Sequence, residues 1–322
     1  MNRRDSRSGF ARELRTILAD ALKDRYAVDG LVGSGGMALV FAGHDLEGDR
    51  AVAIKVLNPE IASAVTTARF VREIVWSSSL QHPNIVPVLD SGDARGFLYL
   101  VMPLIEGEPL SDRLARQPPL PRSTAIRYAT QVALALEYAH HKGIVHRDIK
   151  PGNILISEDD AMVADFGVAR ALGIASGNTL TGPGAPIGTL AYMSPEQSLG
   201  SLEVDGRSDI YSLGCVVYEM LAGRRAFDGN SLGQILKQQE SLPPSIDGLR
   251  ADLPPVISAA VMQALQKDPG LRQQTARAFA DALAAGGLPT RDPVAAPRTG
   301  LWLLIAAGLA VAALVATLLL GR

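Results

Sequence analysis

The sequence predicts an α+β protein, followed by one C-terminal transmembrane helix. Short apolar runs at 52–55 and 97–102 are typical of strands, and a strand pair is expected to begin at 81–86 and to end at 97–102. Between residues 123 and 140 the apolar positions recur instead at helical spacing. Residues 301–320 carry no charge over twenty positions, which is the length of a helix that crosses a bilayer.

Length and composition allow a large folded domain and limit the kinds of partner. The 322 residues are 47% hydrophobic and 20% charged, which suffices for one large domain or two of medium size. A formal net charge of −2 gives no indication of a nucleic-acid partner. The single cysteine, Cys215, cannot form an internal disulfide and fits a reducing compartment. Its apolar neighbours indicate a small core residue.

Residues 1–25 are expected to form an N-terminal extension that contains a short helix. Phe10, Leu14, Ile17, Leu18 and Leu22 recur at helical spacing after a polar, basic start. The simplest interpretation is a helix that packs on the following domain, and a regulatory role is the alternative.

A glycine-rich stretch and a strand that carries a lysine follow. Glycines at 33, 35 and 36 predict a hairpin tip where backbone N–H groups can approach a phosphate, although such turns are common. Lys55 ends the apolar run Val52–Lys55 and must find a partner or reach solvent. A helical pattern then places Glu73 eighteen residues after Lys55.

The polar residues with the clearest chemistry lie in two short stretches, His146–Asn153 and Asp165–Gly167. Apolar runs flank both stretches, which predicts two brief strands with polar residues at their ends. Asn153 and Asp165 would supply the hard oxygen ligands that suit Mg²⁺. Asp148, set back from the metal, could orient a hydroxyl group and accept its proton.

These two stretches resemble the H-R-D-x-x-x-x-N catalytic loop and the D-F-G segment of protein kinases. Their residues are similar to those of the bacterial Hanks-type, PknB-like serine/threonine kinases. The resemblance covers residues 26–284. It implies a bilobal protein kinase fold with a small β-rich N-lobe and a larger helical C-lobe. It also implies transfer of the ATP γ-phosphoryl group to serine and threonine hydroxyls of protein substrates, with Mg²⁺ or Mn²⁺ as cofactor.

The resemblance assigns roles to individual residues. Asp148 orients the substrate hydroxyl and takes its proton, Lys150 neutralises charge on the phosphoryl group, and Asn153 and Asp165 hold the metal. Ala38 replaces the third glycine of the family's glycine-rich loop, which implies a stiffer loop. The residues expected to bind ATP, with Glu73 acting through Lys55, are Val32, Gly33, Ser34, Gly35, Gly36, Val40, Ala53, Lys55, Glu73, Met102 and Ile105.

Residues 165–196 resemble an activation segment. The resemblance implies autophosphorylation at Thr179 or Thr181, where the phosphate would pair with Arg147, and the alternative is that both are ordinary loop threonines. Thr189 corresponds to the family's substrate-pocket threonine. The residues with structural roles, among them a carboxylate–arginine pair and an aspartate that anchors the catalytic-loop backbone, are Arg147, Glu196, Asp209 and Arg272.

A linker and an apolar segment follow the kinase-like region. Residues 285–300 are rich in proline and glycine, and residues 301–320 span about 30 Å as a helix. Trp302 and the flanking Arg298 and Arg322 favour a membrane span, and a buried apolar helix or a disordered tail is the alternative. The expected location is the cell membrane, crossed once, with the kinase domain in the cytoplasm. Gly308 and Ala312 are a weak indication of a homodimer.

Two other functions compete with an active protein kinase. A membrane-anchored pseudokinase scaffold would have lost Lys55, Asp148, Asn153 or Asp165, and all four are present. A small-molecule phosphotransferase would have no need of the activation segment, which serves protein substrates.

Overall fold

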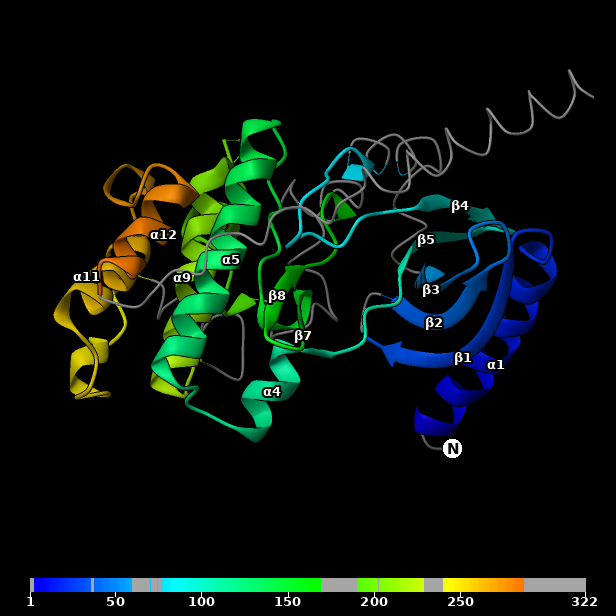
Figure 1. Ribbon diagram of the computed structural model, residues 1–322, viewed down its shortest axis with the longest axis horizontal. Helices are drawn as coiled ribbons and strands as arrows, with labels where there is room; N and C mark the ends of the chain where they lie inside the picture. The colour runs from blue at the N-terminus through cyan, green and yellow to red at the C-terminus, as the bar shows by residue number, and fades with distance from the viewer. Residues whose placement is uncertain are drawn as a thin grey trace, which may run out of the picture. The chain divides into compact units, whose positions relative to one another are not determined.

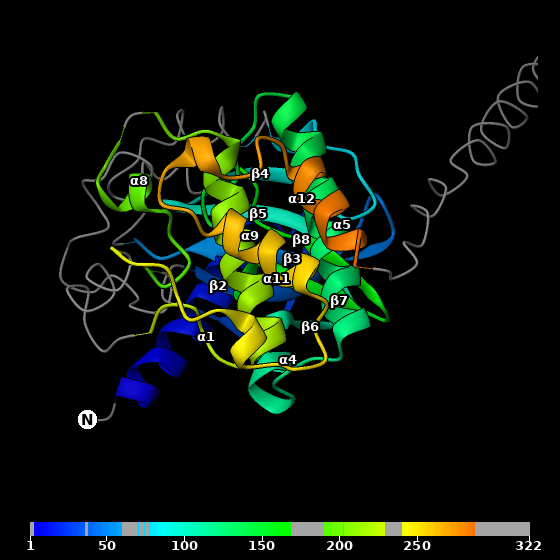
Figure 2. The same cartoon turned by 90° about the vertical axis from the view of Figure 1, so that its left-hand side faces the viewer.

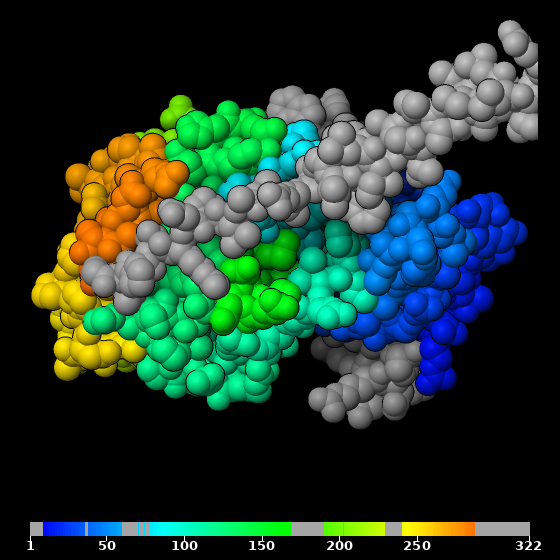
Figure 3. All heavy atoms as spheres, viewed as in Figure 1, coloured from blue at the N-terminus to red at the C-terminus, as the bar shows by residue number. Residues whose placement is uncertain are grey.

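The computed structural model describes residues 3–35, 38–59, 70, 74, 77–168, 190–201, 203–228 and 240–286. The chain separates into two compact units, Met1–Pro289 and Thr290–Arg322, and every described residue belongs to the first. Within that unit the strands of an N-lobe and the helices of a C-lobe lie at opposite ends (Figure 1). The face drawn in Figure 3 shows the same division, with blue to cyan residues at one end and green to orange residues at the other.

The N-lobe is a five-stranded antiparallel sheet in the order β1-β2-β3-β5-β4. Its strands are β1 (Tyr26–Ser34), β2 (Ala38–Asp45), β3 (Arg50–Leu57), β4 (Asp90–Ala94) and β5 (Phe97–Pro103). Along β3, Val52, Ile54 and Val56 are fully buried on one face, while Ala53 and Lys55 alternate with them on the other. The two faces therefore have different partners, and Lys55 lies on the face opposite Ile54.

A helix covers the Ile54 face of the sheet. Leu14 and Leu18 of α1 (Arg3–Ala21) are buried in one cluster with Phe41 and Ile54, and Figure 1 shows α1 beside β1. The predicted packing helix is confirmed, but it begins at Arg3 and is longer than expected. Once the buried turns of a helix have formed, adding polar residues with adequate helix propensity to its end requires no new nucleus.

The strand pair β4–β5 begins later than the apolar pattern suggests. Residues 85 and 86 look strand-like, yet Ile85 makes only one isolated bridge, to Val163, and β4 starts at Asp90. Pro87 interrupts the pattern because proline has no backbone N–H to donate to a ladder. The bridge ties this connection to the segment that leads to Asp165, through Val86 N–H to the Val163 carbonyl at 2.9 Å.

The C-lobe is built mainly of helices. Its main elements are α4 (Leu110–Arg116), α5 (Arg122–His141), α8 (Pro195–Ser198), α9 (Gly206–Ala222), α11 (Pro255–Ala264) and α12 (Ala276–Ala284). A small sheet adds β6 (Glu108–Pro109), β7 (Ile154–Ser157) and β8 (Asp160–Val163), and single turns of 3₁₀ helix lie at Pro151–Asn153, Ile246–Gly248 and Pro269–Leu271. Figure 2 views this lobe end-on, with α9 and α11 in front and α5 and α12 to one side.

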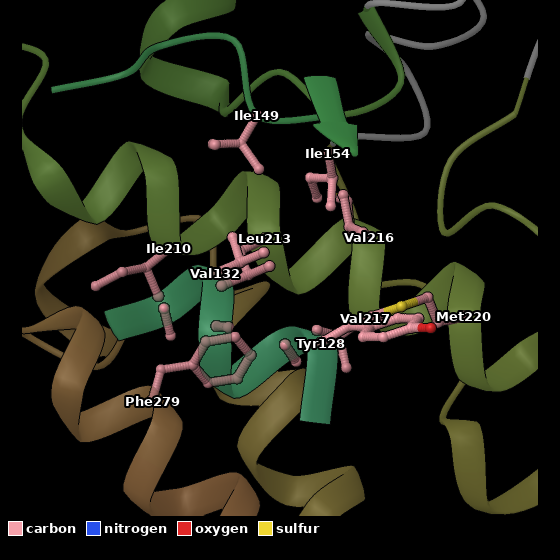
Figure 4. Close-up of a cluster of buried hydrophobic side chains, with 14 of the residues drawn as sticks. Tyr128, Val132, Ile149, Ile154, Ile210, Leu213, Val216, Val217, Met220 and Phe279 are labelled. Carbon is pink, nitrogen blue, oxygen red and sulfur yellow. The ribbon is translucent and has the colours of Figure 1, made fainter. Parts of the chain in front are cut away.

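The predicted helix at 123–140 is confirmed as α5, which packs against α9 and α12. Figure 4 shows Tyr128 and Val132 of α5, Phe279 of α12 and Val216 and Val217 of α9 within one cluster of buried side chains. Ile149, from the stretch that carries Asp148, points into the same cluster and is 1% exposed. The core therefore anchors that stretch from below, because withdrawing Ile149 would expose its side chain and leave a cavity.

No helix among the described residues combines the length and apolar character needed to cross a bilayer. The predicted linker and membrane span, from residue 287 onward, lie outside the part of the chain that the structure describes.

Candidate active site

The two polar stretches meet because a short hairpin folds one back on the other. His146–Asn153 precedes β7, Asp165 follows β8, and the two strands pair with Ile154 opposite Val163. The Ala164 N–H consequently donates to the Asn153 carbonyl at 2.9 Å. Residues twelve positions apart in the sequence thus become neighbours at the end of the hairpin.

The Asp148 carboxylate is held by two side chains from its own loop. Lys150 Nζ donates to both carboxylate oxygens, at 3.0 Å to Oδ1 and 2.8 Å to Oδ2. Asn153 Nδ2 donates to Asp148 Oδ2 at 3.0 Å and to the Asp148 carbonyl at 2.8 Å. Both amide hydrogens of Asn153 are therefore used on Asp148, and its amide oxygen remains as an acceptor.

That amide oxygen and the carboxylate of Asp165 form a donor set suited to a hard divalent cation. Asn153 is 7% exposed and is bonded through its backbone to the residue before Asp165. Mg²⁺ is typically bound by one or two protein oxygens together with phosphate oxygens and water. The residues present fit such an ion, although no cluster of three or more His, Cys, Asp or Glu side chains occurs within the described ranges.

Lys55 reaches this site from the N-lobe. Its Nζ donates to Asp165 Oδ2 at 2.5 Å, and both side chains are mostly buried, at 16% and 14% exposed. Burial alone would raise the pKa of Asp165, but the charge and hydrogen bond of Lys55 outweigh it and hold that pKa below its ordinary value. Asp165 is therefore ionised at neutral pH. Glu73, the expected partner of Lys55, lies outside the described residues.

His146 links the two stretches from the interior. It is fully buried, and its ring meets Phe166 edge-on at 4.6 Å between centroids. Its Nε2 lies 2.9 Å from the Ala164 carbonyl, and its Nδ1 lies 3.2 Å from the Asp148 nitrogen. Because a carbonyl only accepts and a backbone N–H only donates, the imidazole donates through Nε2 and accepts at Nδ1.

Asp209, at the start of α9, holds the backbone of the same loop. It is fully buried and accepts the His146 N–H at 2.8 Å, the Arg147 N–H at 2.7 Å and a hydrogen bond from His140 Nε2 at 2.8 Å. Burial opposes ionisation, but these donors, His140 foremost, keep the pKa of Asp209 below its usual value. A charged acceptor thus lies beneath the loop that carries Asp148.

Glu196 and Arg272 form a buried pair at the edge of the C-lobe. Arg272 Nη1 donates to Glu196 Oε1 at 2.7 Å and Nη2 donates to Oε2 at 2.8 Å. Ser208 Oγ adds a bond to Oε1 at 2.5 Å. Burial would raise the pKa of Glu196, yet Arg272 and Ser208 lower it. The pair anchors α8 to the lobe.

The N-lobe residues of the candidate ATP site share one side of the sheet. Ala53 lies opposite Met102 in the β3–β5 ladder, and both are buried in a cluster that Ala164 and Val168 join from the other lobe. Val40 and Ile105 pack against that cluster, and Gly33 pairs with Val40 in the β1–β2 ladder. The Gly35 N–H donates to the Ala38 carbonyl across the hairpin. Val32 and Ser34 are exposed in β1. The site predictions that lie outside the described residues are Gly36, Glu73, Thr179, Thr181 and Thr189.

Sequence reasoning missed three residues of this region. Leu155 packs against the Met102 cluster, whereas its neighbours Ile154 and Ile156 enter the C-lobe core. Strand alternation could have revealed this, because the middle of three apolar residues must face the other way. His140 bonds Asp209 and Gln197 bonds the Arg147 carbonyl, and nothing in their local sequence indicates those partners.

Comparisons with known proteins agree with this geometry. The family model for the protein kinase domain matches residues 26–281. Serine/threonine-protein kinase PknB of Mycobacterium tuberculosis is 43% identical over 266 residues, which cover 79% of this chain and 42% of that protein. Serine/threonine-protein kinase PrkC of Bacillus subtilis is 39% identical over 263 residues, covering 81% and 40%. The chain therefore matches less than half the length of these curated relatives.

A solved structure shows the same architecture. The crystal structure of Rad53 1–466 in complex with AMP-PNP superposes with a TM-score of 0.66 at 27% identity, covering 81% of this chain and 65% of that one.

Proposed function

The chain belongs to the protein kinase domain family, and we propose that it transfers the γ-phosphoryl group of ATP to serine and threonine hydroxyls of protein substrates. One observation carries the proposal. Asp148 is fixed by Lys150 and Asn153, and the hairpin from Asn153 brings Asp165 and its partner Lys55 to the same place. The four side chains whose loss would favour a pseudokinase, Lys55, Asp148, Asn153 and Asp165, thus lie close together.

Asp148 acts on the substrate hydroxyl. Its carboxylate is about one-fifth exposed, so an incoming hydroxyl can donate to it while Asn153 keeps its orientation. Lys150 lies within 3.0 Å of that carboxylate, where its charge also lowers the energy of a phosphoryl group in transfer. Preference for serine and threonine follows from Lys150 together with Thr189, as the family pattern implies.

Nucleotide binding falls to the N-lobe face that carries Lys55. We infer that Lys55 binds the α and β phosphates, that the loop from Gly33 to Val40 covers them, and that Ala53, Met102 and Ile105 enclose the adenine. Glu73 would clamp Lys55 during turnover. A divalent cation, Mg²⁺ or Mn²⁺, would be held by Asn153 and Asp165 and would neutralise phosphate charge. The nucleotide analogue named for the Rad53 structure supports the inference of ATP binding.

The proposals on regulation and membrane location concern segments that lie mostly outside the described residues. We propose that Thr179 or Thr181 is autophosphorylated and that the phosphate pairs with Arg147, which lies beside Asp148. We also propose that residues 26–284 form the kinase domain, residues 285–300 a linker, and residues 301–320 a span that holds the domain at the cytoplasmic face of the cell membrane, with a homodimer as one arrangement.

Autophosphorylation of the full chain tests the proposal. The protein is incubated with Mg-ATP beside the Asp148→Asn variant, and modified residues are mapped by mass spectrometry. We expect phosphate on Thr179 or Thr181 in the unaltered protein only. Absence of phosphate from both proteins, despite measurable ATP binding, would overturn the transferase function and favour a nucleotide-binding scaffold. Phosphate in both would exclude Asp148 from the role given to it.

A further inference from the structure

The residue just before Asp148 has an unusual backbone conformation. Arg147 has a φ of 69°, in the left-handed region that residues with a side chain rarely adopt. The carbonyl of Arg147 and the nitrogen of Asp148 belong to one rigid peptide plane. The direction of that carbonyl therefore sets where the Asp148 side chain begins, and a conformation of this kind persists only where its surroundings hold it.

Two hydrogen bonds hold the Arg147 backbone, one on each side of its Cα. Its N–H donates to Asp209 Oδ1 at 2.7 Å, and its carbonyl accepts from Gln197 Nε2 at 2.9 Å. Asp209 belongs to the anchor described above. Gln197 comes from α8, whose first two residues, Pro195 and Glu196, end the segment 165–196.

The other end of the Gln197 amide is also occupied, which fixes its orientation. Oε1 accepts the Ser194 N–H at 3.3 Å and the Ser194 hydroxyl at 3.0 Å, while the Gln197 N–H donates to Ser194 Oγ at 3.4 Å. This reciprocal arrangement is a capping box at the start of α8. With the oxygen facing Ser194, the NH₂ group must face the Arg147 carbonyl.

The helix that carries Gln197 is itself anchored through the neighbouring residue. Glu196, one residue earlier, is bound by Arg272 and Ser208. Gln197 therefore ties the peptide that precedes the proposed catalytic base to an anchored helix.

We propose that Gln197 is a positioning residue that holds Arg147 in its left-handed conformation and so aligns the Asp148 carboxylate for phosphoryl transfer. The inference rests on the proposed kinase function for its effect on rate, but the hydrogen bond it concerns exists whether or not the protein is active. It also makes the alignment of Asp148 depend on the docking of α8.

Three variants of the full chain separate the donor from the cap. Gln197→Glu keeps an oxygen acceptor for Ser194, suits the third helical position of a capping box, and removes the donor to Arg147. Gln197→Met removes the donor without adding a charge. Ser194→Ala weakens the cap but leaves the Gln197 side chain and the backbone N–H at position 194 in place.

The kinetic readouts are kcat and KM for a peptide substrate and for ATP, with concentrations of competent enzyme set by nucleotide-analogue binding. We expect kcat to fall about tenfold in both Gln197 variants, equivalent to about 1.4 kcal/mol, with each KM within about twofold. The melting temperature of Gln197→Glu should fall by about 2–4 °C, because the Arg147 carbonyl loses its hydrogen bond from Gln197. Ser194→Ala should lower the melting temperature by a similar amount but keep kcat within about twofold.

Other outcomes would overturn the proposal. An unchanged kcat in either Gln197 variant would show that the bond does not align Asp148. Loss of kcat in Gln197→Glu alone would assign the effect to the new charge. Parallel loss of kcat and melting temperature in all three variants would reduce Gln197 to a helix cap.

Amide hydrogen exchange of residues 145–153 provides a readout that does not depend on activity. Faster exchange of this peptide in Gln197→Met than in Ser194→Ala is expected, because the loop loses a restraint only in the former. If the unaltered protein shows no phosphoryl transfer, the proposed function fails while faster exchange still supports the restraint. Equal exchange in the two variants would refute it.

Discussion

Replacing Arg272 should destabilise the C-lobe more than most single substitutions, because one guanidinium satisfies five acceptors in a fully buried position. Its five N–H donors reach both carboxylate oxygens of Glu196 and the backbone carbonyls of Gln266 at 2.8 Å, Arg207 at 3.0 Å and Lys267 at 3.0 Å. Removing one partner of a buried ion pair typically costs about 3–5 kcal/mol, since the other charge is left without compensation. We expect a loss in that range for Arg272→Met.

The conservative variant sharpens this expectation. Arg272→Lys keeps the positive charge but offers three donors from one atom, so it cannot meet Glu196 and three carbonyls together. It should lose about 2 kcal/mol or more, because buried acceptors left unmade cost about 1–3 kcal/mol each. The double variant Arg272→Met with Glu196→Leu should recover much of the loss, because no buried charge then remains unpaired.

Urea unfolding of the full chain, followed by tryptophan fluorescence or circular dichroism at pH 7, measures these differences. Because the pKa of Glu196 is lowered in the folded state, the pair stabilises the protein above the carboxyl's ordinary value of about 4.5, and this stabilisation is lost as the pH falls below it. The difference between the parent and Arg272→Met should therefore shrink as the pH approaches and passes 4.5. If Arg272→Lys were within 0.5 kcal/mol of the parent, or the double variant no better than Arg272→Met, the reasoning from unpaired donors and charge would be wrong.

Three further predictions concern other buried groups. Asp209→Asn should lower kcat at least tenfold with little change in KM for ATP. The cause is that the NH₂ group of asparagine would face the N–H groups of His146 and Arg147, whose hydrogen bonds Asp209 now accepts. Steady-state kinetics measures both constants, and an unaffected kcat would refute the prediction. Burial lowers the pKa of Lys267 to about 8, so the unfolded state binds more protons between about pH 8 and 10.5 and stability should rise across that window. In urea unfolding, Lys267→Met should lack this rise, and an identical pH profile in both proteins would contradict it. Burial also raises the pKa of the Cys215 thiol, so a thiol reagent should label it at the rate of global unfolding, and fast labelling of the native protein would count against its burial.

Much of the fold could be predicted because its signals are local. The periodicity around Val132 predicted α5, and the glycine hairpin predicted the β1–β2 turn, since each depends on residues a few positions apart. The boundary errors have equally local causes. Pro87 delays β4, and α1 runs into polar sequence ahead of Phe10.

The contacts that hold the site together could not be predicted from spacing. Asp209 lies 62 positions from the Arg147 N–H that it accepts, and Gln197 lies 50 positions from the Arg147 carbonyl. Neither separation in sequence produces a periodic pattern of residues, because both contacts depend on how α8 and α9 pack beneath the loop. A single hydrogen bond leaves no pattern in sequence unless the neighbouring residues also point to it.

The ion pair between Lys55 and Asp165 has a consequence for ligand binding. Each side chain is about 15% exposed, so leaving either charge unpaired would be unfavourable, and at 2.5 Å they neutralise each other across the two lobes. In the proposed kinase the nucleotide phosphates take Lys55 and the metal takes Asp165. A metal that bound alone would separate Asp165 from Lys55, and a nucleotide that bound alone would draw Lys55 away from Asp165. The two ligands should therefore bind more tightly together than either does alone, and by linkage each should raise the affinity of the other by the same factor.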